Sequence, residues 1–210
     1  MNTAIEDLYA AFSNVPKPKA IDACSHCIDD IELKTLLRTN LRELTPDNLS
    51  SYASSAFLTA GDVDDYLYFL PRILEISIRR DWWWPDIEVT GRAIKDAGWQ
   101  DWPDDLQVAL QKFLLSAIDW LVESGTHDRI SEWMCGIAIA GLDVRPFLTI
   151  IEMDDKAVLA YFEDDAGRLP DGKLSNAFWN LPNEGHDRIV EWFRSEKIAR
   201  VAHVAFGYKV

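Results

Sequence analysis

The spacing of apolar residues is the feature that most limits how this chain can fold. Apolar residues recur every three or four positions along almost the whole sequence, the interval that lines up one side of an α-helix. No stretch shows the alternation of apolar and polar residues between hairpin turns that is typical of β-strands. The sequence therefore predicts an all-α protein. The longest predicted apolar stripe consists of Leu106, Leu110, Phe113, Leu114, Ile118 and Leu121.

Helix-start and helix-stop residues divide this pattern into segments. Thr45-Pro46-Asp47 offers an N-cap, a proline at the first helical position and an acid in the first turn. Gly61 then breaks that helix, and Asp62 caps the next one. The connections are short, so successive helices are expected to pack antiparallel. The sequence predicts helices over residues 5–12, 31–38, 45–58, from 62 onward, 86–97, 104–122, 127–140, 143–152, 154–165, 173–181 and 186–204.

One heptapeptide occurs twice: HDRISEW at 127–133 and HDRIVEW at 186–192. As a helix start, it places an aspartate in the first turn, where a negative side chain meets the helix dipole. It also places Ile and Trp three positions apart on one face, which suits burial. We interpret the heptapeptide as a structural repeat.

The alternative interpretation makes His127 and His186 acid–base groups or metal ligands. In a stack of helices packed about 10 Å apart, two such positions would lie roughly 20 Å from each other. One reaction centre could not use both histidines. The duplication therefore argues against catalysis at this motif.

A fainter third copy begins at Gly61, so related helix pairs recur at intervals of about 60 residues. The chain resembles α-helical solenoids of the HEAT and armadillo kind over about residues 41–205. It is also similar to bacterial helical proteins with the layout PKP–CxxC–LRELTPD–GDVDDYLYFLPRI, a likeness that implies no activity. The resemblance implies antiparallel helix pairs stacked as a short α-solenoid. We expect an N-terminal arm, residues 1–40, packed on a helical repeat domain, residues 41–210.

The net charge of −14 limits the classes of partner. Such a surface repels nucleic-acid phosphates and anionic membranes, and it attracts cationic proteins. The N-terminus lacks a basic segment followed by an apolar one, and the chain has no apolar run long enough for a membrane helix. Three cysteines are too few for a disulfide scaffold. We expect a reduced, cytoplasmic protein that binds neither nucleic acid nor membrane.

Cys24-Ser25-His26-Cys27 is a CxxC motif. A zinc site would need two further ligands, and the sequence shows no second CxxC or HxxxH. A redox motif of the thioredoxin kind would follow a strand, which the sequence does not predict. Zinc binding, redox chemistry and a pair of reduced cysteines near a helix start stay open, so Cys24 and Cys27 are metal candidates only. Asp62-Val63-Asp64-Asp65 does not fit a calcium loop and reads as an acidic helix start.

Two clusters are candidates for partner binding. The first is Trp82-Trp83-Trp84 before Pro85, with Trp102 nearby, because three consecutive indoles cannot all face one core. At least one ring is expected to be exposed or to pack on a nearby arginine, and exposed tryptophans anchor protein interfaces. The second is Glu163-Asp164-Asp165, which falls at a helix end, where the dipole disfavours acids.

No phosphate-binding, hydrolase or metalloprotease motif appears, and we predict no catalytic residue and no cofactor. The leading hypothesis is a bacterial protein-binding module with a basic protein partner. An immunity-type protein that neutralises a basic toxin would fit. The alternative is an enzyme that acts on a small molecule or sugar with carboxylates in a helical cleft. The sequence leaves the oligomeric state open.

Overall fold

The computed structural model describes residues 1–206. In this range the secondary structure consists of α-helices and short 3-10 turns, with isolated β-bridges but no β-strand. The all-α prediction is confirmed. The helices are α1 (Asn2–Ala11), α2 (Asp30–Arg38), α3 (Pro46–Ser55), α4 (Val63–Arg79), α5 (Ile87–Asp96), α6 (Asp104–Ser124), α7 (Ile130–Ile139), α8 (Arg145–Ile151), α9 (Asp155–Asp165), α10 (Glu184–Phe193) and α11 (Glu196–Phe206).

The chain forms two compact units, Met1–Phe113 and Leu114–Val210, which divide within α6. The predicted apolar stripe of α6 is buried along its whole length. The predicted boundary between an arm and a repeat domain at residue 40 is not tested by this division and stays a prediction. None of the helices in residues 1–206 has the length and apolar character needed to cross a bilayer.

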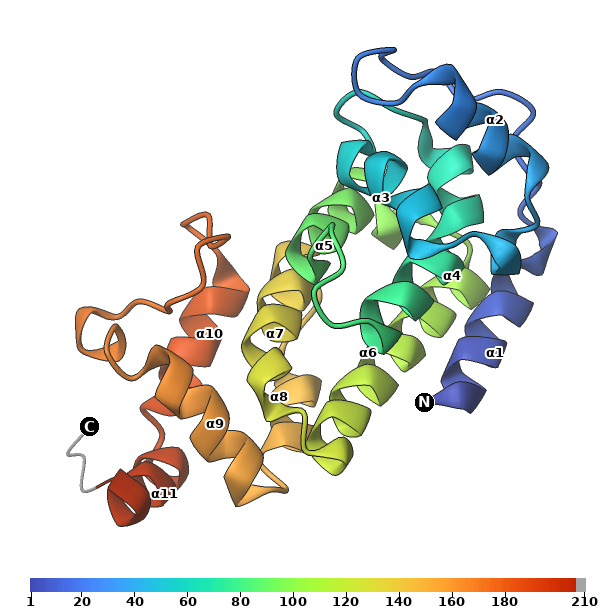
Figure 1. Ribbon diagram of the computed structural model, residues 1–210. Helices are drawn as coiled ribbons and strands as arrows, with labels where there is room; N and C mark the ends of the chain where they lie inside the picture. Colours follow the sequence, from blue (N-terminus) through green and yellow to red (C-terminus); the bar gives the residue numbers. More distant parts are fainter. Residues whose placement is uncertain (207–210) are drawn as a thin grey trace. The chain divides into compact units, whose positions relative to one another are not determined.

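In the first unit, α4 packs against α1 and α3, and α3 also contacts α2 and α5 (Figure 1). The inward side of α4 is the one that the sequence predicts, because its apolar residues from Tyr66 to Leu74 at helical spacing are buried. The ring of Phe69 packs 4.8 Å from that of Tyr52 on α3. This contact joins the centres of the two helices.

The predicted N-caps of α3 and α4 are confirmed. Thr45 Oγ1 accepts the backbone N–H of Asn48 at 3.2 Å, and Asp62 Oδ1 accepts that of Asp65 at 3.0 Å. In each case the third residue of the helix accepts the N–H of the cap in return, which completes a capping box. Helix α3 nevertheless ends at Ser55, three residues before its predicted end, because the chain turns sharply at Phe57.

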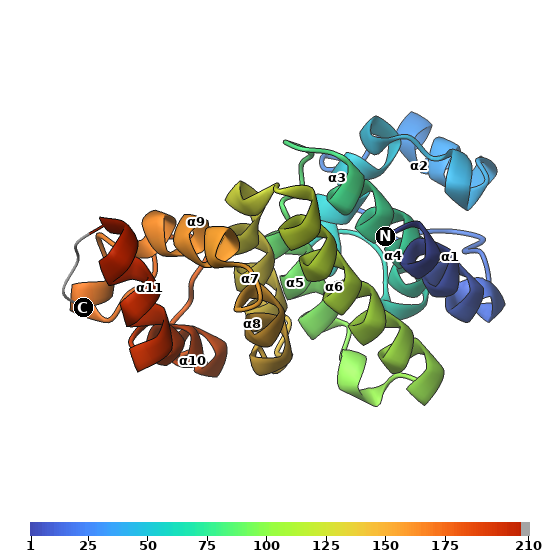
Figure 2. The same ribbon diagram turned by 90° about the horizontal axis from the view of Figure 1, so that it is seen from below.

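In the second unit, α9 lies between α7 and α11, and α10 packs against α7, α8 and α11 (Figure 2). Ile130 and Trp133 of the first heptapeptide are buried, as are Ile189 and Trp192 of the second. The structural interpretation of the repeat requires this burial.

The two copies of the heptapeptide differ in how they enter the helix. His127–Arg129 forms a 3-10 turn before α7, whereas the second copy lies inside α10. Asn183 caps α10 and accepts the backbone N–H of His186 at 3.1 Å. Gly185, which directly precedes the second copy, belongs to the first turn of α10 and does not end a preceding helix.

The helix predicted over 173–181 is wrong, because this stretch forms bends and turns. Asn176 Oδ1 accepts the backbone N–H of Phe178 at 2.9 Å, a local bond that competes with a helix. Leu174 is buried, but Phe178 and Leu181 are 37% and 55% exposed. The stretch therefore has no continuous apolar face to hold a helix in place.

The single helix predicted over 186–204 is also wrong, because α10 and α11 are separate helices. The break falls at Arg194 and Ser195, and the carbonyl of Ser195 accepts the backbone N–H of Ala199 at 2.9 Å to start α11. A serine followed by Glu196 is a helix-start pair. It restarts the helix within a stretch of uninterrupted apolar periodicity.

We expect Gly185→Ala to lower the free energy of unfolding. A Cβ at this position would lie 2.6 Å from the Cβ of Ala138 on α7 and 3.3 Å from its Cα. Overpacking of this kind costs about 1–3 kcal/mol, more than the roughly 1 kcal/mol that alanine gains over glycine inside a helix. Urea denaturation measures the difference.

Gly167→Ala is the matched control, because nothing lies within 4 Å of a Cβ at this position and its backbone is not left-handed. We expect it to leave stability within about 0.5 kcal/mol of the parent. Equal effects of the two substitutions would contradict a close approach between α10 and α7.

Candidate functional site

An open groove of about 800 Å³ lies on the first unit. Segment 20–24, the loop 57–62 and Asp65 form its walls, and we call it the acidic groove. It receives the carboxylates of Asp22, Asp62 and Asp65. In the part of the chain that the structure describes, none of the residues that line it is Lys, Arg or His.

Two backbone hydrogen bonds hold the walls of the acidic groove together. The N–H of Cys24 donates to the carbonyl of Thr59 at 2.8 Å, and the N–H of Gly61 donates to the carbonyl of Asp22 at 2.8 Å. Ala23 and Ala60 form an antiparallel bridge between these bonds. A segment that precedes α2 is thereby fixed to the loop between α3 and α4.

The loop between α3 and α4 is a strained turn. Phe57 has a φ of 61°, in the left-handed region that non-glycine residues rarely adopt. The backbone N–H groups of Leu58, Thr59 and Ala60 all donate to the carbonyl of Ser55, so the turn closes on one acceptor. Strained backbone of this kind occurs preferentially at functional sites. It presents Leu58, which is 62% exposed, at the rim of the acidic groove.

Two polar side chains at the floor of the acidic groove are buried enough that their charged forms are disfavoured. Burial, with the negative charges of Asp62 and Asp64, raises the pKa of Asp65, although the N–H of Asp62 favours its ionised form. Behind Gly61 lies Tyr52, whose buried hydroxyl makes no hydrogen bond with any described residue. Burial and the nearby Asp65 raise the pKa of this hydroxyl as well. The groove thus gathers three carboxylates, two of which accept backbone N–H groups at the start of α4, and no basic side chain lines it.

A second groove of the first unit, about 470 Å³, has a different character. Its charged residues pair with each other: Arg42 forms two hydrogen bonds with Glu6, at 2.7 and 2.8 Å, and its guanidinium lies 3.9 Å from the centre of the Tyr9 ring. The Tyr9 hydroxyl in turn donates to Glu75 Oε2 at 2.7 Å. These contacts fasten α1 to α4, so we assign this groove a structural role.

The predicted tryptophan cluster is divided between surface and interior. Trp82 is 99% exposed with a φ of 62°, and Trp84 is 51% exposed. Trp83 is half-buried, and its indole N–H donates to the carbonyl of Pro46 at 3.0 Å. Trp102 is buried, where its indole donates to the carbonyl of Ala97 at 2.9 Å. Trp82 and Trp84 are exposed, and their role as an anchor stays a prediction, whereas Trp102 packs in the interior.

Trp82 and Trp84 do not belong to the acidic groove. Their connector is held at Pro46, the first residue of α3, whereas the groove follows the last residue of that helix, Ser55. At 1.5 Å per residue, the two ends of α3 are about 15 Å apart. The structure thus gives the first unit two separate surface features.

The acidic cluster at the end of α9 is also divided between the surface and the interior. Glu163 and Asp164 are exposed, whereas Asp165 is 1% exposed. Asp165 Oδ1 accepts the backbone N–H of Ser175 at 2.5 Å, which closes the loop after α9, and Oδ2 has no hydrogen-bond partner among the described residues. Asp165 therefore has a structural function that accounts for its place at this helix end, and it is not on a surface that a partner could contact.

Burial raises the pKa of Asp165 to about 6, against hydrogen bonds from Ser175 that lower it. The negative charge of Asp164 adds to the increase. The ionised form of this side chain is therefore a cost to the folded state at neutral pH.

Cys24 and Cys27 are both exposed, and Cys24 lines the acidic groove. Within residues 1–206 no group of three or more His, Cys, Asp or Glu side chains is placed to hold a metal ion. The two thiols thus have no further described ligand beside them, and zinc binding gains no geometric support.

The repeated histidines have different surroundings. His127 Nε2 donates to the carbonyl of Val122 at 3.1 Å. The buried His186 donates from Nδ1 to Asp187 at 3.0 Å, and its ring packs edge-on against Trp179. Each ring has a structural partner of its own.

The acidic groove as a whole cannot be predicted from the sequence. Asp62 and Asp65 are visible as a helix start, but nothing in the sequence links them to Asp22 or to Tyr52. The signal that could have found the loop is Gly61, because a Cβ there would lie 2.8 Å from the Tyr52 hydroxyl. That approach requires the fold to be known.

No protein-family model matches the chain, and neither the curated proteins nor the solved structures contain a match.

We expect Asp165→Asn to stabilise the protein at neutral pH. The folded pKa of about 6 lies above the ordinary value of 3.8, so the folded state binds the proton more tightly than the unfolded state does. Stability therefore falls as pH rises from about 4 to 6 and stays lower above that range. Two pKa units correspond to about 3 kcal/mol, and asparagine can still accept the Ser175 N–H. Urea denaturation from pH 4 to 8 should show the variant about 2–3 kcal/mol more stable at pH 7 and equal to the parent near pH 4. A difference that does not change with pH would contradict this assignment.

Proposed function

We propose that the protein is a non-catalytic binding module whose acidic groove docks a basic segment of another protein. The observation that carries the proposal is the lining of the groove: three carboxylates and no basic side chain. The net charge of −14 supports it, because the whole chain would steer a cationic partner.

The chemistry of the groove also favours this occupant. A guanidinium or ammonium group would place a positive charge beside the Asp65 carboxylate. It can also donate hydrogen bonds to several oxygens at once. Exposed Leu58, which lines the groove, would contact the aliphatic part of a lysine or arginine side chain. The groove thus fits a basic segment with apolar stems better than it fits a free anion.

The wider form of the proposal adds a stacked arrangement of helix pairs. Helix pairs stacked as a short α-solenoid would present long faces to a protein partner. The exposed rings of Trp82 and Trp84 would then anchor the partner at a second point. A cytoplasmic immunity-type protein that neutralises a basic toxin is one role of this kind, and the enzymatic alternative stays a prediction.

We expect a fluorescent eight-residue peptide of alternating arginine and leucine to bind the full chain, and Asp22→Asn/Asp62→Asn/Asp65→Asn to weaken its binding about tenfold at low salt. Asparagine at position 62 keeps the cap of α4, because it caps helices as well as aspartate does. Fluorescence anisotropy measures the dissociation constant, and added salt should weaken parental binding more than variant binding.

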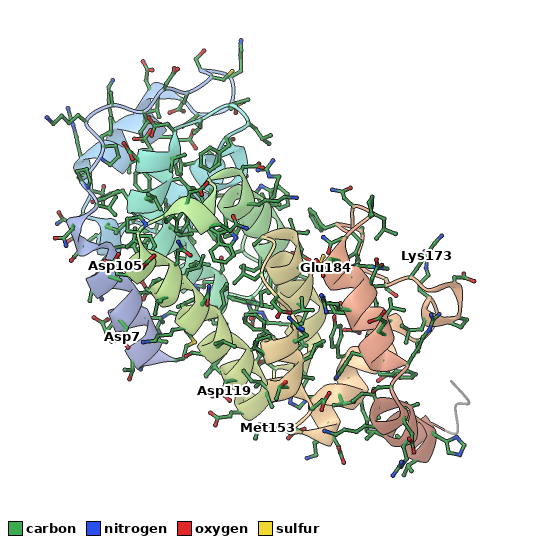
Figure 3. All side chains as sticks on the ribbon, turned by 180° about the vertical axis from the view of Figure 1, so that it is seen from behind. Asp7, Asp105, Asp119, Met153, Lys173 and Glu184 are labelled. Carbon is green, nitrogen blue, oxygen red and sulfur yellow. The ribbon has the colours of Figure 1, made fainter. Side chains whose placement is uncertain are left out.

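The control is Asp7→Asn/Asp105→Asn/Asp119→Asn, which changes the net charge equally. These three carboxylates, labelled in Figure 3, are exposed and are not among the residues that line the acidic groove. We expect the control to weaken binding by less than about threefold. If it weakens binding as much as the groove variant, the effect is one of net charge and the groove is not the docking site.

A further inference from the structure

Cys24 and Cys27 frame a tight turn that the fold holds from both sides. The carbonyl of Cys24 accepts the backbone N–H groups of Cys27 at 2.9 Å and of Ile28 at 3.1 Å. On one side, the N–H of Cys24 is bonded to Thr59, and on the other, the side chain of Ile28 is buried. The backbone therefore keeps the two thiols together.

The surroundings of Cys24 favour its thiolate form. The nearby backbone N–H group of His26, the Cys27 thiol and the backbone N–H group of Cys27 lower the pKa of the Cys24 thiol. Both side chains are exposed, so a reagent in solution can reach them. Cys135, in contrast, is buried in α7.

We propose that Cys24 and Cys27 form a redox-reactive dithiol that is converted to an intramolecular disulfide by exchange with a small disulfide. Its basis is the anchored turn, in which a backbone hydrogen bond of 2.9 Å joins Cys27 to Cys24 while both side chains are exposed. It does not depend on the proposed binding of a basic segment, because it concerns the covalent state of the turn.

The reaction proceeds in two exchange steps. The Cys24 thiolate attacks one sulfur of the small disulfide, which forms a mixed disulfide on Cys24 and releases one small thiolate. Cys27 then loses its proton and attacks the sulfur of Cys24, which forms the Cys24–Cys27 bond and releases the second small thiolate. The two cysteines lose two electrons and two protons, and the small disulfide takes them up to become two thiols.

The charge around the turn determines which small disulfide reacts best. Asp22, Asp29 and Asp30 flank the two cysteines and are exposed. They repel an anionic disulfide and attract a cationic one. We therefore expect a cationic or neutral disulfide to react faster than an anionic one. Cystamine, which is cationic, is the probe for the test.

The test incubates the reduced full chain with cystamine at pH 7 and follows its mass. We expect the chain to lose two hydrogen atoms without gaining a cysteamine group, and digestion should yield residues 20–34 as one peptide with an internal disulfide. Cys135→Ser should behave like the parent. Cys27→Ser should stop at one cysteamine adduct on Cys24.

The order of the two steps gives an independent readout. Cys24→Ser should react with cystamine at least fivefold more slowly than Cys27→Ser, because the backbone N–H groups of His26 and Cys27, which Cys27→Ser keeps, favour the Cys24 thiolate. Both positions are exposed, so circular dichroism of the two variants should match that of the parent. Stable cysteamine adducts on the parent chain without an internal disulfide, or equal rates for the two variants, would overturn the proposal.

Discussion

The pairing of residues 22–24 with residues 59–61 is the interaction on which the surface of the first unit depends. Two backbone hydrogen bonds and one bridge hold a segment without regular structure against the turn between α3 and α4. Because the backbone groups of this segment are paired, it can carry polar side chains without a helix of its own. Asp22 and Cys24 lie in the acidic groove for this reason.

Gly61 permits that pairing for two physical reasons. Its φ of 68° lies in the left-handed region, and a side chain there would meet the Tyr52 hydroxyl at 2.8 Å. Its N–H is also the donor to Asp22. Gly61 thus ends the turn, leaves room for the ring of Tyr52 and links the 57–62 loop to segment 20–24. The cap at Asp62 begins α4 immediately afterwards, so the position of the carboxylates follows from the same turn.

Local signals in the sequence predict most of the helical framework. The caps Thr45, Asp62 and Asp154 act within three or four residues, and a single sequence contains all the information that they need. The buried faces of α4 and α6 follow equally from their apolar spacing. The failures at 173–181 and 186–204 occur where local preferences compete. Asn176 satisfies its own turn, and Ser195 restarts a helix inside a periodic stretch, so periodicity alone gives the wrong boundaries.

The candidate sites were less accessible to prediction, because they depend on residues far apart in the chain. Asp22 and Gly61 are separated by 39 positions, and no local pattern connects them. The left-handed backbone at Phe57 is harder still to predict, because left-handed positions usually carry glycine or asparagine and this one does not. The sequence could show that acids and a CxxC exist. Only the fold shows that one of the cysteines lies beside three of the acids.

Three features around the acidic groove make the free protein less stable than it could be. A left-handed Phe57, a buried Tyr52 hydroxyl without a partner and a partly desolvated Asp65 each reduce the stability of the free protein. They lie around a single loop, whereas the other groove of the first unit pairs its charges internally. A ligand that donates hydrogen bonds and brings positive charge would relieve the cost at Asp65 directly.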